Sequence, residues 1–151
     1  MLELEYELVK KDFIESIKEH QDIVLSTCQR NIVTSRTVSF INNGFTFYIL
    51  TSVNSNKCKQ ITENENVSLC LGDLQMEGKA RIIGHPMSEG NLLISEMYRD
   101  KLMEYYNRFA RYKFAAYIEI KCTYIKQWRV SSNKDYFYCL DIAKEKAIRK
   151  G

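Results

Sequence analysis

The sequence predicts a mainly β (α+β) fold, an antiparallel β-barrel with peripheral helices. Two observations carry this prediction. Segments in which apolar and polar residues alternate recur along the chain, as they do in half-buried strands. Short turns such as Asn43-Gly44 and Gly72-Asp73 join these segments. Strands that meet through short turns, without intervening helices, form an antiparallel sheet that closes or nearly closes into a barrel.

The N-terminal segment predicts one helix and then one strand. From about residue 3 to 19, apolar residues such as Tyr6 and Phe13 recur at helical spacing between charged residues, which is typical of an amphipathic helix. The apolar run 22–28 is interpreted as the first strand, and residues 29–31 as a tight turn into the second strand.

A hairpin follows. Residues 32–41 alternate and predict a strand with Arg36 on one face and Thr37 on the other. Asn43-Gly44 then gives the strongest short-range hairpin signal, because both central residues of a type I′ turn need positive φ. We therefore expect residues 32–41 to pair with residues 45–50 around a type I′ turn.

A short helix is predicted directly after this hairpin. Ser52, Asn54 and Ser55 are each a possible N-cap, because their side-chain oxygens can accept a hydrogen bond from a free amide at the start of a helix. The helix carries Lys57 and is expected to end near Asn64.

The rest of the chain predicts four strands and a long helix. Residues 67–71 and 74–83 are interpreted as strands, and Gly78 within the second indicates a bulge or a close backbone approach. The remaining elements are a helix at 89–111 whose apolar stripe packs in the core, strands at 114–128 and 135–140, and a basic tail at 141–151 that is expected to fray.

Length and composition predict one domain over residues 1–151, with the helix at about 3–19, the barrel at about 22–140 and the tail at 141–151. Hydrophobic residues make up 45% of the chain and charged residues 27%, an ordinary globular balance. The net charge of +3 is too small and too evenly spread to indicate a nucleic-acid or membrane partner.

The cysteines and the N-terminus predict a cytoplasmic location. Five cysteines are an odd number without short paired spacings, so they indicate reduced thiols rather than disulfides or a zinc site. The acidic N-terminus lacks the basic start of a signal peptide, and no apolar run approaches the ~20 residues that span a bilayer.

Arg36 and Lys57 are the strongest candidates for binding a ligand. A phosphate is held by charge-assisted donors together with free N–H groups at the start of a helix. Thr51, Ser52 and Ser55 lie close to these cations in the sequence and add hydroxyl donors. An exposed loop with an unpaired lysine is the alternative interpretation.

The segment that carries these residues resembles the FMN-binding split barrels of the pyridoxamine 5′-phosphate oxidase-like superfamily. It reads IVTSRTVSFINNGFTFYILTSVNSNKCKQITENENVSLCLGD. The resemblance covers about Asp22 to Trp128 and rests on the order of elements and on spaced residues. It implies an antiparallel split β-barrel that binds FMN.

The resemblance also implies which residues bind the cofactor. In that family an arginine strand, a threonine at the end of the third strand and a Ser-x-Lys at the next helix hold the phosphate, the ribityl chain and the edge of the flavin. A glutamine also reaches the flavin, and a tryptophan does so across a dimer interface. The matching residues are Arg36, Thr37, Val38, Ser39, Leu50, Thr51, Ser55, Asn56, Lys57, Gln75 and Trp128.

Three departures from the family pattern concern the vitamin B6 substrate rather than the cofactor. The oxidases proper carry a substrate-binding lysine where this chain has Ile41, and Ser-Arg-Lys where it has Ser55-Asn56-Lys57. Nothing after Trp128 matches their Arg-x-His segment. The resemblance therefore implies an FMN site without a pyridoxamine 5′-phosphate site.

Together these features predict an FMN-dependent oxidoreductase of the flavin reductase or nitroreductase kind. It would act as a homodimer with the cofactor at the interface, and reduce a small-molecule substrate with NAD(P)H. The alternatives are a non-enzymatic carrier or sensor of flavin or haem, and an interaction module without a cofactor. FAD, haem or deazaflavin are alternatives to FMN. No catalytic residue is assigned, and His20 and His85 lack a second ligand at metal spacing.

Overall fold

The computed structural model describes all residues from 1 to 151 and joins ten strands in one antiparallel sheet. The strands are β1 (Leu2–Leu4), β2 (Asp22–Gln29), β3 (Ile32–Ser39), β4 (Ile41–Asn43), β5 (Thr46–Ser52), β6 (Asn66–Leu71), β7 (Leu74–Ile82), β8 (Ala115–Ser131), β9 (Lys134–Asp141) and β10 (Lys146–Lys150). The helices are α1 (Tyr6–Lys18), α2 (Asn56–Glu63), a 3₁₀ turn η1 (Glu89–Asn91) and α3 (Leu92–Phe109).

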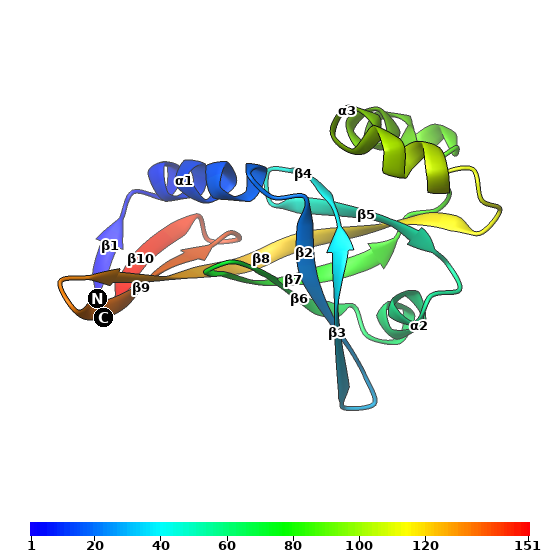
Figure 1. The fold of residues 1–151 in the computed structure, drawn as a ribbon. Helices are drawn as coiled ribbons and strands as arrows, with labels where there is room; N and C mark the ends of the chain where they lie inside the picture. The colour runs from blue at the N-terminus through cyan, green and yellow to red at the C-terminus, as the bar shows by residue number, and fades with distance from the viewer.

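The sheet curves into an open barrel. Its main order is β1-β10-β9-β8-β7-β6-β2-β3, and β5 pairs with both β4 and β8. The edge strand β3 also comes close to β5, so the two ends of the curved sheet approach each other. Figure 1 shows β8 running through the middle of the molecule, with β9, β10 and β1 towards one end and α2 and α3 towards the other. The predicted antiparallel split barrel with peripheral helices is confirmed.

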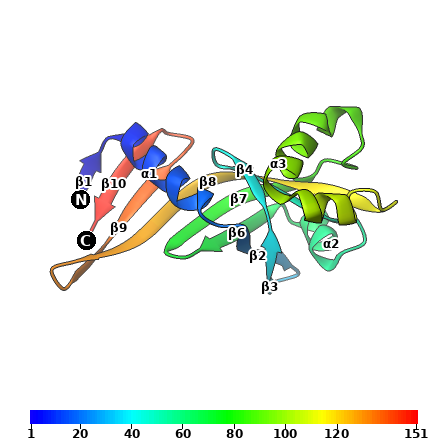
Figure 2. The ribbon, with the colours of Figure 1, turned by 45° about the horizontal axis from the view of Figure 1, so that its top comes forward.

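Two hydrophobic clusters lie on opposite sides of β5 and β8. The barrel core contains 23 buried residues, including Phe13 of α1 and Phe47 and Ile49 of β5. A second cluster of seven buried residues, including Leu50 and Tyr98, lies where α3 covers the other side. Figure 2 shows α1 and α3 as separate helices over different parts of the sheet.

Strand β8 is covered on both faces in its first part, which the sequence pattern did not predict. Alternation had predicted one exposed face for the whole of residues 114–128, yet Ala115 to Ile120 are all buried. The barrel core covers one face of this part of β8 and α3 covers the other. Lys121 and Thr123 are exposed again around the buried Cys122, and the shift of register at Thr123 then makes Ile125 rather than Tyr124 the next buried residue.

Burial of two titratable residues along β8 makes the free energy of unfolding fall at alkaline pH. It raises the pKa of the Cys122 thiol and of the Tyr117 hydroxyl, each to about 12. The unfolded chain loses these protons nearer the ordinary pKa values of about 8.5 and about 10. The native state therefore binds more protons in this range, and the free energy of unfolding falls as pH rises from about 9 to about 12. Urea unfolding at pH 8 to 11 measures this, and a constant midpoint would contradict it.

The predicted hairpin differs in register and partner. The chain breaks at Phe40, β3 pairs with β2 along its length, and only the short β4 pairs with β5. The two central residues of the turn are Gly44 and Phe45 rather than Asn43 and Gly44, and of these only Gly44 has positive φ, at 59°. A glycine at the first central position is the requirement of a type II′ turn. The Asn42 side-chain amide donates to the Gly44 carbonyl at 3.0 Å and stabilises this arrangement.

The chain ends also differ from the prediction. The segment 141–151 does not fray, because β10 pairs with both β9 and β1. Ala147 is fully buried within it. Residues 2–4 form strand β1 rather than the start of the helix, which begins at Tyr6. The two termini consequently lie side by side (Figure 1).

The long helix is interrupted. Where the sequence predicted one helix at 89–111, η1 precedes α3, and Leu102 within α3 has non-helical angles of φ −134° and ψ 54°. The predicted apolar stripe does pack in the core, and Tyr98 before the break and Tyr106 after it are both buried in the second cluster. None of the helices is long and apolar enough to cross a membrane.

The close backbone approach at Gly78 is confirmed, and the bulge lies opposite it, where Thr123 of β8 is the extra residue. The register between β7 and β8 shifts at Glu77 and Gly78. A Cβ atom at position 78 would lie 2.8 Å from the carbonyl oxygen of Lys121.

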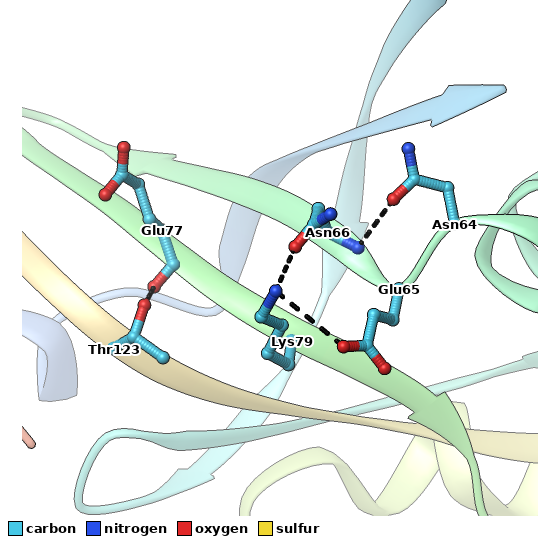
Figure 3. A network of polar contacts seen from close by, with 6 residues as sticks. All are labelled: Asn64, Glu65, Asn66, Glu77, Lys79 and Thr123. Carbon is cyan, nitrogen blue, oxygen red and sulfur yellow. Dashed lines mark hydrogen bonds and ion pairs between the residues drawn. The ribbon is translucent and has the colours of Figure 1, made fainter. Parts of the chain in front are cut away.

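The solvent-facing side of the strands around this bulge carries polar ties (Figure 3). The Lys79 ammonium contacts the Asn66 side-chain oxygen and lies 3.7 Å from the Glu65 carboxylate. The Thr123 hydroxyl donates to the Glu77 carbonyl at 3.3 Å. Exposed contacts of this kind contribute little free energy individually, but they join β6, β7 and β8 across the bulge.

Candidate functional site: a pair of cations at the barrel end

Arg36 lies on the inward face of β3, opposite Leu25 of β2. One terminal nitrogen of its guanidinium donates to the Thr27 hydroxyl at 2.8 Å and to the Leu25 carbonyl at 3.3 Å. The other donates to the side-chain oxygen of Gln60 in α2, at 3.1 Å. All three acceptors are neutral. Burial lowers the pKa of the Arg36 guanidinium. The hydrogen bonds hold this group in place, but they do not neutralise its charge.

Lys57 lies in the first turn of α2 and brings a second positive charge to the same place. Ser55 caps this helix by accepting a hydrogen bond from the Cys58 amide at 3.3 Å, which resolves the three N-cap candidates. Burial lowers the pKa of the Lys57 ammonium, and the charge of Arg36 also lowers it, against an opposing effect of Cys58. None of the four ion pairs of the chain includes Arg36 or Lys57. Two neighbouring cations without a carboxylate, beside a helix N-terminus, have the chemistry that binding an anion requires.

Thr27 and Gln60 hold this arrangement together, and the sequence analysis missed both. The buried Gln60 accepts a hydrogen bond from Thr27 and donates one to the Thr34 hydroxyl at 3.1 Å. It therefore fixes α2 to β2 and β3 while orienting Arg36. A polar residue on the apolar face of a short helix, next to Ile61, was the available signal.

Leu50 and Ser39, predicted to lie along the cofactor, are joined by a tyrosine from α3. The Leu50 amide donates to the Tyr98 hydroxyl at 3.1 Å, and that hydroxyl donates to the Ser39 carbonyl at 3.4 Å. The Tyr105 hydroxyl donates to the Leu50 carbonyl at 3.3 Å. Beyond the end of β4, these two tyrosines provide hydrogen-bond partners for the backbone amide and carbonyl of Leu50 at the edge of β5. Helix α3 thereby spans the gap in the split barrel.

The Tyr98→Phe variant is expected to lower the free energy of unfolding by about 1–2 kcal/mol, because it leaves the buried Leu50 amide without its acceptor. Urea unfolding of the variant and the wild type measures the difference. Tyr112→Phe is the control, since that residue is exposed and its hydroxyl has no partner within the chain. Equal losses in both variants would show that the Tyr98 hydrogen bonds are not responsible.

Gln75 and Trp128 lie elsewhere. Gln75 is exposed on β7 and lines a groove of about 430 Å³ together with Lys126 and Phe137. Trp128 is 46% exposed and pairs across strands with Phe137. No hydrogen bond or ion pair connects either residue to Arg36 or Lys57. The chain thus brings together Arg36, Ser55, Asn56 and Lys57, places Thr37, Val38, Ser39, Leu50 and Thr51 on nearby strands, and leaves Gln75 and Trp128 apart.

The histidines and acidic residues form no further centre. His85 is engaged at both ring nitrogens, one 2.8 Å from the Tyr112 carbonyl oxygen and the other accepting from the Met87 amide at 3.0 Å. His20 is exposed. No three His, Cys, Asp or Glu side chains lie together in a group that could hold a metal ion. All five cysteines are free thiols, of which Cys58, Cys122 and Cys139 are buried.

The family model of pyridoxamine 5′-phosphate oxidase matches residues 9–129, which include every candidate residue of the site. The chain belongs to this family. No curated protein matches the sequence.

Solved structures show the same fold at low identity. The pyridoxamine 5′-phosphate oxidase-related, FMN-binding protein of Nostoc punctiforme is 12% identical, covers 99% of this chain and 98% of its own, and superposes with a TM-score of 0.69. General stress protein 26 of Bacillus anthracis is 22% identical over 78% and 91%, with a TM-score of 0.63. The haem storage protein of Vibrio cholerae is 13% identical over 74% and 88%, with a TM-score of 0.64.

This member of the pyridoxamine 5′-phosphate oxidase family lacks two features that the resemblance associated with the vitamin B6 substrate. Ile41 is buried against α3 in the second cluster, so residue 41 supplies neither a cation nor an accessible side chain. The chain after Trp128 is used for β9 and β10, which pair with each other and with β1.

Proposed function

We propose that this protein binds FMN and is an FMN-dependent oxidoreductase. The observation that carries the proposal is the cation pair, because Arg36 and Lys57 lie together without a carboxylate partner. A phosphate monoester fits that charge, and the free amides at the start of α2 add donors to it. Thr51 and Ser55 would bind the phosphate and the adjoining ribityl chain.

The remaining candidates would line the flavin itself. Residues 37–39 and Leu50 belong to the two strand ends that Tyr98 joins, and we assign them to the flavin ring. Gln75 and Trp128 are remote from that pair within one chain. We assign them to contacts across the interface of a homodimer, with one FMN at each of two equivalent sites.

The reaction we propose is the reduction of a small acceptor, such as a free flavin or a nitro compound, by NAD(P)H. Bound FMN would supply the hydride chemistry, and the protein would supply binding and orientation. No acid–base group lies at the cation pair, which such a reaction tolerates. The buried Ile41 is the reason to propose an acceptor other than pyridoxamine 5′-phosphate. Five free thiols support a reducing, cytoplasmic setting.

The test begins with the absorption spectrum of the purified protein and a titration with FMN. A flavin spectrum, or quenching of FMN fluorescence with saturation at one FMN per chain, is expected. Oxidation of NADH or NADPH is then followed with and without a nitro compound. Colourless protein that leaves FMN fluorescence unchanged would overturn the proposal.

A carrier or sensor of flavin or haem is the second candidate. It is favoured by the lack of an acid–base group, and by fold relatives described as a haem storage protein and as an FAD-binding protein of Mesorhizobium loti. FAD and deazaflavin share the phosphate that the cation pair would hold. Haem would need an axial ligand, and both ring nitrogens of His85 are already engaged. Protein that holds flavin but oxidises neither nicotinamide would favour the carrier.

A further inference from the structure

Gln60 is a buried side chain of α2 that holds Arg36 and is not itself a candidate ligand of the cofactor. Only 4% of its surface is exposed. Its side-chain oxygen accepts from the Arg36 guanidinium at 3.1 Å and from the Thr27 hydroxyl. Its side-chain nitrogen donates to the Thr34 hydroxyl at 3.1 Å. Both polar atoms of the amide therefore have partners, and the amide is fixed in one orientation.

A glutamate at position 60 would satisfy the same hydrogen bonds. Glutamate has the length and shape of glutamine, and all three neighbours could donate to its carboxylate, because the Thr34 hydroxyl can turn its proton towards an acceptor. The carboxylate would also form a charge-assisted bond with Arg36, which is stronger than a bond to a neutral amide. The hydrogen bonds alone therefore do not explain why this residue is a glutamine.

The two side chains differ in their effect on the charge of Arg36. Glutamine leaves this charge without a counterion, since no ion pair of the chain includes Arg36. Lys57 is a second cation without a carboxylate partner, and burial and the charge of Arg36 both lower its pKa. A glutamate at position 60 would neutralise one of the two cations. Glutamine keeps both positive charges available beside the free amides at the start of α2.

A phosphate monoester is the ligand that matches two cations without counterions. Its second pKa is about 6, so at neutral pH it carries a charge of about −1.5 to −2. A phosphodiester group or a carboxylate carries a single negative charge. The neutral side chain at position 60 therefore favours the dianion over singly charged groups.

We propose that Gln60 is a positioning residue that holds Arg36 by hydrogen bonds while leaving its charge free for a dianionic phosphate monoester. The proposal rests on the phosphate site of the proposed function, and it adds a residue that determines which anions this site accepts. Gln60 acts through Arg36 rather than by contact with the ligand.

The test compares two variants of the full chain by fluorescence titration with FMN and with riboflavin, which lacks the phosphate. Gln60→Glu should weaken FMN binding about tenfold or more, the scale of one hydrogen bond to a charged group, and should leave riboflavin binding unchanged. The free energy of unfolding of the flavin-free Gln60→Glu variant should stay the same or rise, because the carboxylate pairs with Arg36.

Gln60→Met separates the hydrogen bonds from the charge. Methionine keeps the length of the side chain but offers Arg36 and Thr27 no strong acceptor, so this variant should be the less stable of the two. It adds no negative charge, so it should bind FMN more tightly than Gln60→Glu does. If Gln60 has only a structural role, the less stable variant will also be the weaker binder of FMN, and that order would overturn the proposal.

Gln29→Glu is the matched control. It adds the same charge at the tip of the β2–β3 hairpin, where Gln29 pairs with Ile32, and it should leave FMN binding unchanged. If Gln60→Glu binds FMN as the wild type does, or if Gln29→Glu weakens FMN equally, the role of Gln60 is overturned and the flavin proposal stays intact. A wild-type chain that binds no FMN would overturn both.

Discussion

The Gly78→Val variant is expected to lose about 2–4 kcal/mol of unfolding free energy, at or above the usual cost of overpacking. A Cβ atom there would lie 2.8 Å from the Lys121 carbonyl oxygen and 3.1 Å from Cγ2 of Ile120. The first neighbour is backbone of β8, which β5 and β7 hold from both sides, so it has no free direction in which to move. Urea unfolding followed by circular dichroism measures the loss.

Gly90→Ala is the matched control for this prediction. Gly90 lies in η1, its φ is not positive, and no heavy atom lies within 4 Å of a Cβ atom built there. Alanine restricts the unfolded chain and fits the folded one, so the control should be neutral or slightly stabilising. A Gly78→Val variant as stable as the Gly90→Ala variant would show that β7 and β8 can separate at the bulge.

Features decided by neighbouring residues were predictable from the sequence. The close approach of β7 and β8 at Gly78 follows from a glycine inside an alternating strand, and the start of α2 follows from Ser55 and the residues after it. The turn Gly72-Asp73 likewise joins β6 to β7 with Gly72 at positive φ. In each case the local backbone requirement selects the residue, so one short stretch of sequence contains the signal.

Features decided by distant packing were not predictable in the same way. Continuous burial in the first part of β8 depends on α3 covering a second face, and the α3 sequence alone does not state which face it covers. Strand β10 is rich in lysine and arginine, and its pairing with β9 and with β1, from the opposite end of the chain, makes it a strand. The register of the hairpin depends on whether Asn43 or Gly44 occupies the first central position of the turn. Both choices are compatible with known turn types, so the sequence alone does not decide between them.

The residues of the candidate site fall into the same two groups, those marked by local sequence and those placed by distant packing. Arg36, Ser55 and Lys57 were found from residue type and family spacing. Thr27 and Gln60 hold Arg36 from positions 9 and 24 residues away along the chain. The only local signal is the polar Gln60 on the apolar face of α2, and it does not indicate Arg36 as the partner. The bridging of Ser39 and Leu50 by Tyr98 spans still longer separations. A sequence indicates which groups can bind an anion more readily than which groups position them.

The Lys57→Met variant is expected to weaken FMN binding by about 1.5–3 kcal/mol, the usual scale of a hydrogen bond to a charged group. That loss raises the dissociation constant by about 10- to 150-fold. Methionine keeps an apolar stem of similar length, so the half-buried position stays filled. Fluorescence titration with FMN measures the change, and Arg36→Ala should weaken binding on the same scale.

The control lies two residues further along the same helix. Lys59→Met removes the same charge from α2, but Lys59 is exposed and takes part in no ion pair. If FMN is attracted only by the overall positive charge around α2, both variants will weaken binding equally, and the assignment of Lys57 to the phosphate is wrong. If Lys57 contacts the phosphate, the Lys59→Met variant will bind FMN almost as the wild type does.

The stability of the flavin-free protein separates a binding role of Lys57 from a structural one. Burial and the charge of Arg36 both disfavour the ammonium form of Lys57 in the folded protein, which is why its pKa is lowered. Removing that charge at neutral pH should therefore leave the free energy of unfolding unchanged or raise it. A residue kept only for structure would show the reverse, a less stable protein with undiminished FMN binding. Weaker binding together with undiminished stability would mean that the folded chain holds an unfavourable charge in place for an anionic ligand.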